Sequence, residues 1–234
     1  LFRSQQRPKL FSLDIQLPDM LYSDIVEIDE RVDTKGAVLK ELDPVVTEQI
    51  LRKAFNEGFK SIAIVLLHGY RHWEHEQQIS LIAKKIGFEQ ISASHQISPL
   101  MKIIPRGDTT VVDAYLSPIL RQYVDQVKDE LGSTQKGFEK LMFMQSNGGL
   151  TDANYFQGKD AILSGPAGGV VGMVKTGEKI GLNKLIGFDM GGTSTDVCHY
   201  NGEYERTLET EVAGVRLRSP MMLINTVAAG GGSI

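Results

Sequence analysis

The chain has 234 residues, of which 41% are hydrophobic and 23% charged, as in ordinary globular proteins. Its net charge of −4 gives no basis for nucleic acid or an anionic membrane as a partner, and no apolar run approaches the roughly 20 residues of a membrane span. One cysteine, Cys198, excludes an internal disulfide and a cysteine-based zinc site. With no signal-peptide pattern in LFRSQQRPKL, we expect a cytoplasmic protein.

The first third of the chain alternates strand and helix patterns. Residues 1–20 are expected to be irregular, and the alternation of apolar and polar residues over 25–32 predicts a strand. A turn is expected at Lys35-Gly36. Asp43-Pro44 predicts a helix start, because aspartate caps helices and proline suits the first turn; Gly58 is the expected end.

A strand–helix–strand unit is predicted next. The apolar run 61–69 is typical of a buried strand, 73–86 has helical spacing with Gly87 as its cap, and 88–96 is a second strand. This order favours two parallel strands joined by a crossover helix, as in an α/β layer.

Prolines then interrupt the pattern. Pro99 and Pro105 are expected to break the chain before a long amphipathic helix that starts at Asp108 and is kinked at Pro118. We therefore place a domain boundary near 104–107 and expect two domains. They cover 1–105 and 106–234; the resemblance given below makes them the C-terminal part of a first lobe and the start of a second lobe.

The second domain is expected to carry most of the glycine-rich turns. We predict strands over 141–145, 161–163 and 185–188, a helix over 170–181 and a further β segment over 202–212. Four glycine turns accompany them: SNGG (146–149), SGPAGG (164–169), DMGGTSTD (189–196) and AAGGGS (228–233).

The turn DMGGTSTD has the chemistry of a magnesium–phosphate site. Backbone N–H groups at Gly191 and Gly192 can converge on an anion, and hydroxyl groups follow at Thr193, Ser194 and Thr195. Asp189 and Asp196 would repel a bare phosphate, but Mg²⁺ is commonly held by carboxylates together with phosphates. The alternative is a glycine hairpin with a polar rim.

The other glycine turns support the same interpretation. A helix that begins in SGPAGG would present free N–H groups to an anion, which makes Gly165, Gly168 and Gly169 candidate phosphate-binding residues, with Gly231 in AAGGGS. The alternative is steric, because glycines also let helices pack closely. We expect that role for at least one turn.

The other reactive side chains give weaker evidence for a functional site. His68, His72 and His75 do not share a predicted helix face and lack acidic or cysteine partners, so we expect no metal there, although His68 could face a cleft. Cys198 is interpreted as a core residue. Arg106, Arg216 and Arg218 are interpreted as surface residues, with contact to an anionic ligand as the alternative.

FDMGGTSTDV, with SGPAGGVVG before it and NTVAAGGGSI after it, resembles the hydantoinase A/5-oxoprolinase family. The segments LPDMLYSDIVEIDERVD, VLLHGYRHWEHEQQ, IPRGDTTVVDAYLSPILRQYV and MQSNGGL extend this resemblance over nearly the whole chain. Two segments, IPRGDTTVVDAYLSP and NTVAAGGGS, look closer to 5-oxoprolinases. The family is similar to actin, sugar kinases and heat-shock chaperones. The resemblance implies an α/β, RNase H-like fold of mixed sheets flanked by helices, with parts of two lobes of an actin-like ATPase.

The resemblance also implies a function. We expect ATP- and Mg²⁺-dependent opening of 5-oxoproline to glutamate through phosphorylation of the ring carbonyl. Asp189 and Asp196 would be catalytic and metal-binding, and Gly191, Gly192 and Thr193 would contact phosphate. A second, hydantoinase B-type subunit or domain and a homo-oligomeric full-length protein are expected. No first Asp-x-Gly-Gly-Thr loop is present, so we expect the chain alone to be an inactive fragment.

Three alternatives stay open. The substrate could be a hydantoin, as in an ATP-dependent N-methylhydantoinase. The protein could instead be a non-catalytic, actin-like module switched by nucleotide, or a structural subunit of a larger amidohydrolase or carboxylase assembly.

Overall fold

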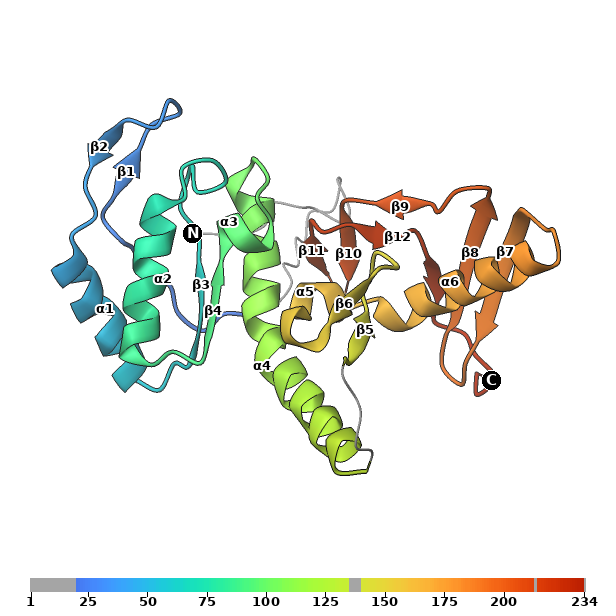
Figure 1. The fold of residues 1–234 in the computed structure, drawn as a ribbon. Helices are drawn as coiled ribbons and strands as arrows, with labels where there is room; N and C mark the ends of the chain where they lie inside the picture. Colours follow the sequence, from blue (N-terminus) through green and yellow to red (C-terminus); the bar gives the residue numbers. More distant parts are fainter. Residues whose placement is uncertain (1–19, 135–139, 213, 234) are drawn as a thin grey trace. The chain divides into compact units, whose positions relative to one another are not determined.

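The computed structural model describes residues 20–134, 140–212 and 214–233 (Figure 1). The irregular segment expected over 1–20 lies outside this part of the chain except for Met20. Chain contacts divide the protein into unit 1 (Leu1–Arg121 and Thr210–Arg218) and unit 2 (Gln122–Glu209 and Ser219–Ile234). This division falls inside one helix, and the lobe boundary expected at 105/106 stays a prediction.

Unit 1 is an α/β unit with small sheets. Its elements are β1 (Arg31–Val32), β2 (Val38–Lys40), α1 (Pro44–Asn56), β3 (Ser61–Ile64), α2 (Glu74–Ile86), β4 (Gln90–Ala93), α3 (Ser94–Ile97), the first part of α4 (Ile103–Thr134), β10 (Thr210–Val212) and β11 (Val215–Leu217).

Local sequence signals explain the helix ends. The side chain of Asp43 accepts hydrogen bonds from the N–H groups of Val45 and Val46, and Pro44 opens α1. Gly87 ends α2 with φ of 113°, a left-handed conformation that glycine adopts without a steric penalty. Both predicted helix boundaries are therefore confirmed to within two residues.

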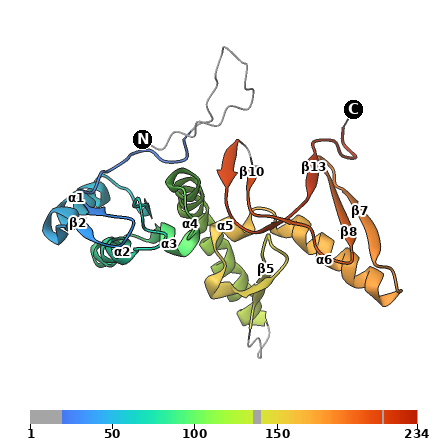
Figure 2. The ribbon, with the colours of Figure 1, turned by 90° about the horizontal axis from the view of Figure 1, so that it is seen from above.

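The predicted crossover is also confirmed. β3 and β4 pair in parallel, with Ser61 opposite Gln90 and Ile64 opposite Ala93. Helices α1 and α2 cover one face of this pair (Figures 1 and 2). α4 lies on the other face, where the Ser61 hydroxyl donates to the carbonyl of Ala114 at 2.5 Å. The buried apolar core lies on the α1/α2 side and consists of Leu42, Leu51, Ile64, Ile79, Ala83 and Phe88.

Several predicted boundaries in unit 1 are wrong. The strand expected over 25–32 is reduced to β1, and residues 23–30 run as irregular chain. The strand expected over 88–96 gives way to helix α3 after Ala93. Pro105 does not break the chain, because α4 begins at Ile103; in the first turn of a helix, a proline loses no intrahelical hydrogen bond.

Unit 2 holds the glycine-rich turns. Its elements are the remainder of α4, β5 (Met142–Met144), β6 (Leu150–Asp152), the 3-10 helix η1 (Ala153–Tyr155), α5 (Gly158–Ala161), α6 (Ser164–Lys179), β7 (Lys184–Met190), β8 (Thr195–Asn201), β9 (Arg206–Thr207), β12 (Met221–Met222) and β13 (Asn225–Val227).

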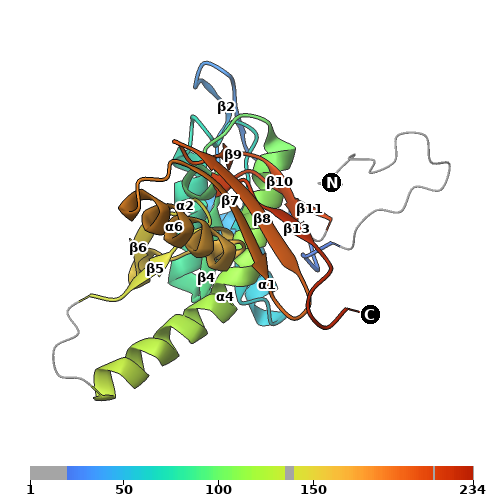
Figure 3. The same cartoon turned by 90° about the vertical axis from the view of Figure 1, so that its right-hand side faces the viewer.

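A three-stranded antiparallel sheet forms the centre of unit 2. Its strand order is β13-β8-β7, and Figure 3 shows α6 lying along one face. Gly177 allows α6 to lie close to the sheet, because a Cβ at this position would lie 2.5 Å from Cδ1 of Leu185 in β7. The opposite face exposes Ile186, Phe188 and Met190. The strand predicted over 185–188 is confirmed, and β7 is longer than expected at both ends.

Two expectations in unit 2 are corrected. The run 161–163 is not a strand, because α5 covers Gly158–Ala161 and α6 starts at Ser164. SGPAGG is therefore the opening of α6 and not a loop after a strand. Three apolar residues in a row are too few to separate strand from helix. Across the described ranges, no helix has the length and apolar character to cross a membrane.

Candidate functional site: two paired glycine turns and two aspartates

The site is built on the hairpin of β7 and β8. Asp189 is directly opposite Asp196, and Met190 is opposite Thr195. Directly opposed residues project to the same face of a sheet, so the two carboxylates leave the sheet together. That face is the one that α6 covers, since the side chain of Met173 on α6 lies over Gly187.

The second glycine turn pairs with the first. The N–H of Gly231 donates to the carbonyl of Gly191 at 2.9 Å, and that of Gly232 donates to Gly192 at 2.8 Å. The Thr195 hydroxyl donates to the carbonyl of Ala229 at 2.6 Å. The structure thus brings DMGGTSTD and AAGGGS, some thirty residues apart, into contact.

Gly230 makes this contact sterically possible. A Cβ at this position would lie 2.6 Å from three backbone atoms of the facing turn, the Gly191 oxygen, the Gly192 carbon and the Thr193 nitrogen. Backbone atoms cannot move aside as a side chain can, so only glycine fits here. By contrast, a Cβ on Gly192 would meet nothing within 4 Å.

Two further residues contact the aspartates. Thr226 of β13 is opposite Asp196, and its hydroxyl donates to Asp196 Oδ1 at 2.6 Å. A Cβ built on Gly169 in α6 would lie 3.8 Å from Asp189 Oδ2, so this carboxylate lies against the first half of α6. Thr226 and Gly230 were missed from the sequence, because only the pairing of β13 with β8 brings them to this site.

The donor set fits a magnesium–phosphate ligand. Within the described residues, neither Asp189 nor Asp196 is paired with a lysine, arginine or histidine, and the N–H groups of Gly192 and Thr193 have no protein acceptor. Two uncompensated carboxylates suit a divalent cation, and free N–H groups in a glycine turn suit phosphate oxygens. Ser194 adds a half-buried hydroxyl group beside them.

Of the other predicted glycines in α6, Gly169 faces Asp189, whereas Gly165 and Gly168 contact neither glycine turn. A Cβ on Gly168 would lie at an ordinary 3.7 Å from Met144 Cγ, and a Cβ on Gly165 would meet nothing within 4 Å. Phosphate binding by Gly165, Gly168 and Gly169 stays a prediction. In SNGG, Gly148 has φ of 81°, and a Cβ there would lie 2.2 Å from the Met222 side chain, which indicates a packing and turning role.

The other reactive residues lie elsewhere. His75 Nδ1 is bonded to Glu30 at 2.7 Å, His68 packs against Tyr70, and His72 lies near the carbonyl of Thr34. Burial raises the pKa of the Cys198 thiol, as expected for a half-buried core residue. Arg106, expected on the surface, is fully buried and bonds to backbone carbonyls. This expectation was wrong.

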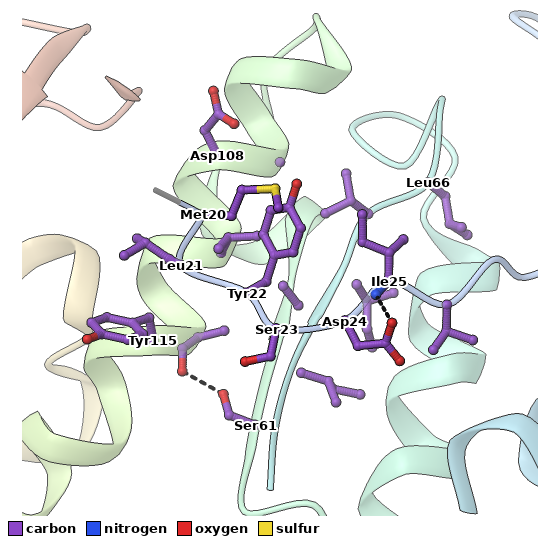
Figure 4. A pocket seen from close by; sticks show the side chains of 18 of the residues that line it. Met20, Leu21, Tyr22, Ser23, Asp24, Ile25, Ser61, Leu66, Asp108 and Tyr115 are labelled. Carbon is purple, nitrogen blue, oxygen red and sulfur yellow. Dashed lines mark hydrogen bonds between the residues drawn. The ribbon is translucent and has the colours of Figure 1, made fainter. Parts of the chain in front are cut away.

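Unit 1 contains a cavity of about 970 Å³ (Figure 4). It is lined by residues of the segment 20–31, of β3 and of α4, and Tyr22 and Asp108 are among them. Asp108 Oδ2 is buried and has no hydrogen-bond partner among the described residues. Burial raises the pKa of this carboxyl to about 6, although the charge of Arg216 opposes the shift.

Comparison with known protein families shows which family the chain belongs to. Residues 106–234 match the family described as "Hydantoinase/oxoprolinase", and residues 1–87 match "Hydantoinase/oxoprolinase N-terminal region". The chain belongs to the hydantoinase/oxoprolinase family. The resemblance inferred from the sequence is thereby confirmed.

Relatives of this hydantoinase/oxoprolinase chain include named enzymes. A 5-oxoprolinase of Dictyostelium discoideum is 41% identical over 98% of the chain and 21% of its own length. A 5-oxoprolinase of Saccharomyces cerevisiae is 41% identical over 100% of the chain and 20% of its own length. The caprolactamase subunit alpha of Pseudomonas jessenii is 28% identical over 87% of the chain and 30% of its length. The chain spans about a fifth of the 5-oxoprolinases.

Two solved structures confirm the predicted fold. A nucleotide-free acetone carboxylase superposes with a TM-score of 0.75 at 27% identity, over 87% of this chain and 29% of that one. An ATP-dependent caprolactamase from Pseudomonas jessenii gives 0.74 at 27% identity, over 88% and 30%. The hydantoinase/oxoprolinase chain thus has the α/β, actin-like ATPase type of fold that its sequence predicts.

Proposed function

We propose that the chain is the part of an ATP-dependent cyclic amide hydrolase that binds the nucleotide phosphates, and that the whole protein opens 5-oxoproline to glutamate. The observation that carries this proposal is the pairing of two glycine turns beside two opposed, uncompensated aspartates. The names of its relatives, 5-oxoprolinase above all, support the choice of substrate.

Each residue of the site has a role in this proposal. Asp189 and Asp196 hold Mg²⁺, and Thr226 fixes the orientation of Asp196. The N–H groups of Gly192 and Thr193 donate to phosphate oxygens, while Thr195 and Gly231 keep the second turn against the first. ATP, when bound, supplies the phosphoryl group that activates the otherwise unreactive ring carbonyl.

Partners and location belong to the same proposal. The name "caprolactamase subunit alpha" supports a second, hydantoinase B-type subunit or domain in the whole protein. We also infer a cytoplasmic location and a homo-oligomeric full-length protein.

The test is an assay of the full-length protein with 5-oxoproline and with N-methylhydantoin, each with and without ATP. The expected result is opening of 5-oxoproline that needs ATP and releases ADP. Turnover without ATP would contradict the phosphorylation mechanism. Faster turnover of N-methylhydantoin would identify an N-methylhydantoinase, and ATP hydrolysis that no cyclic amide stimulates would favour a nucleotide-switched module.

A further inference from the structure

A buried polar network lies at the carboxyl ends of β3 and β4 in unit 1. Its centre is Glu76 of α2, which is fully buried. Glu76 Oε1 accepts hydrogen bonds from the N–H of Leu66 at 2.9 Å and the hydroxyl of Ser94 at 2.6 Å. Oε2 accepts the N–H of His95 at 2.9 Å and lies 2.8 Å from His95 Nδ1.

The direction of these bonds follows from Arg106. Its Nε donates to the Ser94 hydroxyl at 2.9 Å, and its other nitrogens donate to the carbonyls of Leu66, Leu67 and Leu100. A guanidinium has only donors, so the Ser94 hydroxyl oxygen accepts from Arg106, and the Ser94 O–H donates its hydrogen bond to Glu76. Glu76 is therefore an acceptor whose negative charge is balanced by buried Arg106.

This network leaves one nitrogen of His95 without a protein partner. Because Glu76 accepts, the network selects the His95 tautomer with its proton on Nδ1, and in that tautomer the lone pair is on Nε2. No described residue bonds to Nε2, and the His95 side chain is 11% exposed. The indole of Trp73, itself 42% exposed, stacks on the imidazole at 5.6 Å between ring centroids. The result is an oriented hydrogen-bond acceptor bordered by a flat aromatic surface.

The position in the fold also suits a ligand. His95 is the second residue after the end of β4, and Glu76 lies in the first turn of α2, the helix that follows β3 (Figure 1). In α/β sheets, ligands bind outside the carboxyl ends of parallel strands. In a second buried histidine–glutamate pair, His75 and Glu30, the other ring nitrogen has a protein partner, because His75 Nε2 lies 4.0 Å from Glu41.

We propose that His95 Nε2 accepts a hydrogen bond from the ring N–H of the cyclic amide substrate, with Glu76 as the positioning residue and Trp73 as an apolar border for the ring. The inference rests on the proposed function, because the ligand is taken to be a cyclic amide. It makes His95 a specificity-determining residue. A cyclic amide with a ring N–H donates a hydrogen bond to His95 Nε2. Its N-methyl counterpart has no N–H and leaves Nε2 without a partner.

Equilibrium binding of 5-oxoproline and of N-methyl-5-oxoproline to the full-length protein tests the proposal. An unpaired acceptor in a site costs roughly a factor of ten to one hundred in affinity. The wild-type protein should show that preference for the N–H form. His95→Asn keeps a donor toward Glu76 but removes Nε2, so the preference should fall to about threefold or less. His75→Asn, the matched control, should keep it.

The outcomes separate the two proposals. If 5-oxoproline, hydantoin and caprolactam all fail to bind to the wild-type protein, the proposed function and this inference fall together. If 5-oxoproline binds and His95→Asn keeps the wild-type preference, only this inference is overturned. Equal binding of the N–H and N-methyl forms by the wild-type protein overturns it without any variant.

Discussion

Asp189 of β7 and Asp196 of β8 are directly opposed in an antiparallel pair, and both project toward the face that α6 covers. Two opposed carboxylates, with no cation paired to either among the described residues, are a suitable pair of ligands for a divalent ion. This relationship underlies the first prediction.

In the full-length protein, Asp189→Asn and Asp196→Asn should each lower ATP-dependent turnover by roughly a hundredfold or more. Each variant would bind Mg²⁺ more weakly, so the ion would no longer neutralise the phosphate charge. Activity should recover in part at higher Mg²⁺ concentrations. The control is Glu178→Gln, which removes a carboxylate at the far end of α6 that pairs with Lys175. Steady-state kinetics at several Mg²⁺ concentrations measure the effect. Activity as high in both aspartate variants as in the control would show that this loop is not the phosphate site.

The second prediction concerns the contact between the glycine turns. Gly230→Ala forces a methyl group to within 2.6 Å of the facing backbone, so the turns must separate. We expect about tenfold weaker ATP binding, since this costs one or two hydrogen bonds of about 1 kcal/mol each. Gly231→Ala is the matched control, because its Cβ would meet Gly191 at an ordinary 3.8 Å. Titration calorimetry of the full-length protein compares them, and equal affinities would contradict a role for the contact.

The third prediction is a pH dependence of stability that comes from Asp108. Its folded-state pKa of about 6 lies above the ordinary 3.8, because burial disfavours the charged carboxylate. The folded state thus binds the proton more tightly. The stability that protonated Asp108 contributes to the folded state is fully present below about pH 4 and is lost as the pH rises through about 6.

Asp108→Asn should therefore stabilise the chain at pH 7.5 by about 1 kcal/mol, a value reduced for the half-exposed position, and change little at pH 4. Urea unfolding at the two pH values measures this. Asp125→Asn, an exposed position on the same helix, is the control. A wild-type pH slope that persists in Asp108→Asn would assign the dependence to another group.

The fourth prediction separates two glycines of α6. Gly172 is exposed and a Cβ there meets nothing within 4 Å, so Gly172→Ala should stabilise by about 1 kcal/mol through helix propensity. Gly177 is buried against Leu185, so Gly177→Ala should destabilise by about 1–3 kcal/mol through overpacking. Chemical unfolding of the two variants decides the matter. A gain in stability for Gly177→Ala would show that the helix can move away from the sheet.

Local signals were sufficient for part of the fold. Asp43-Pro44 and Gly87 mark helix ends because capping depends on adjacent residues, and the parallel pairing of β3 and β4 follows from the order of elements. The run 161–163 was assigned wrongly because three apolar residues fit either kind of element. Pro105 was wrongly predicted to break the chain, because a proline in the first turn of a helix removes no intrahelical hydrogen bond.

The amino-acid sequence by itself determined the family, the type of fold and the turn that carries Asp189, Asp196 and Gly191, because these depend on residue types at fixed spacing. Only the tertiary structure decided what lies opposite that turn. Thr226 and Gly230 reach it through the register of β13 with β8, and the unpaired nitrogen of His95 arises from a network that joins separate elements. Such contacts are set by packing across long sequence separations, which no local pattern records.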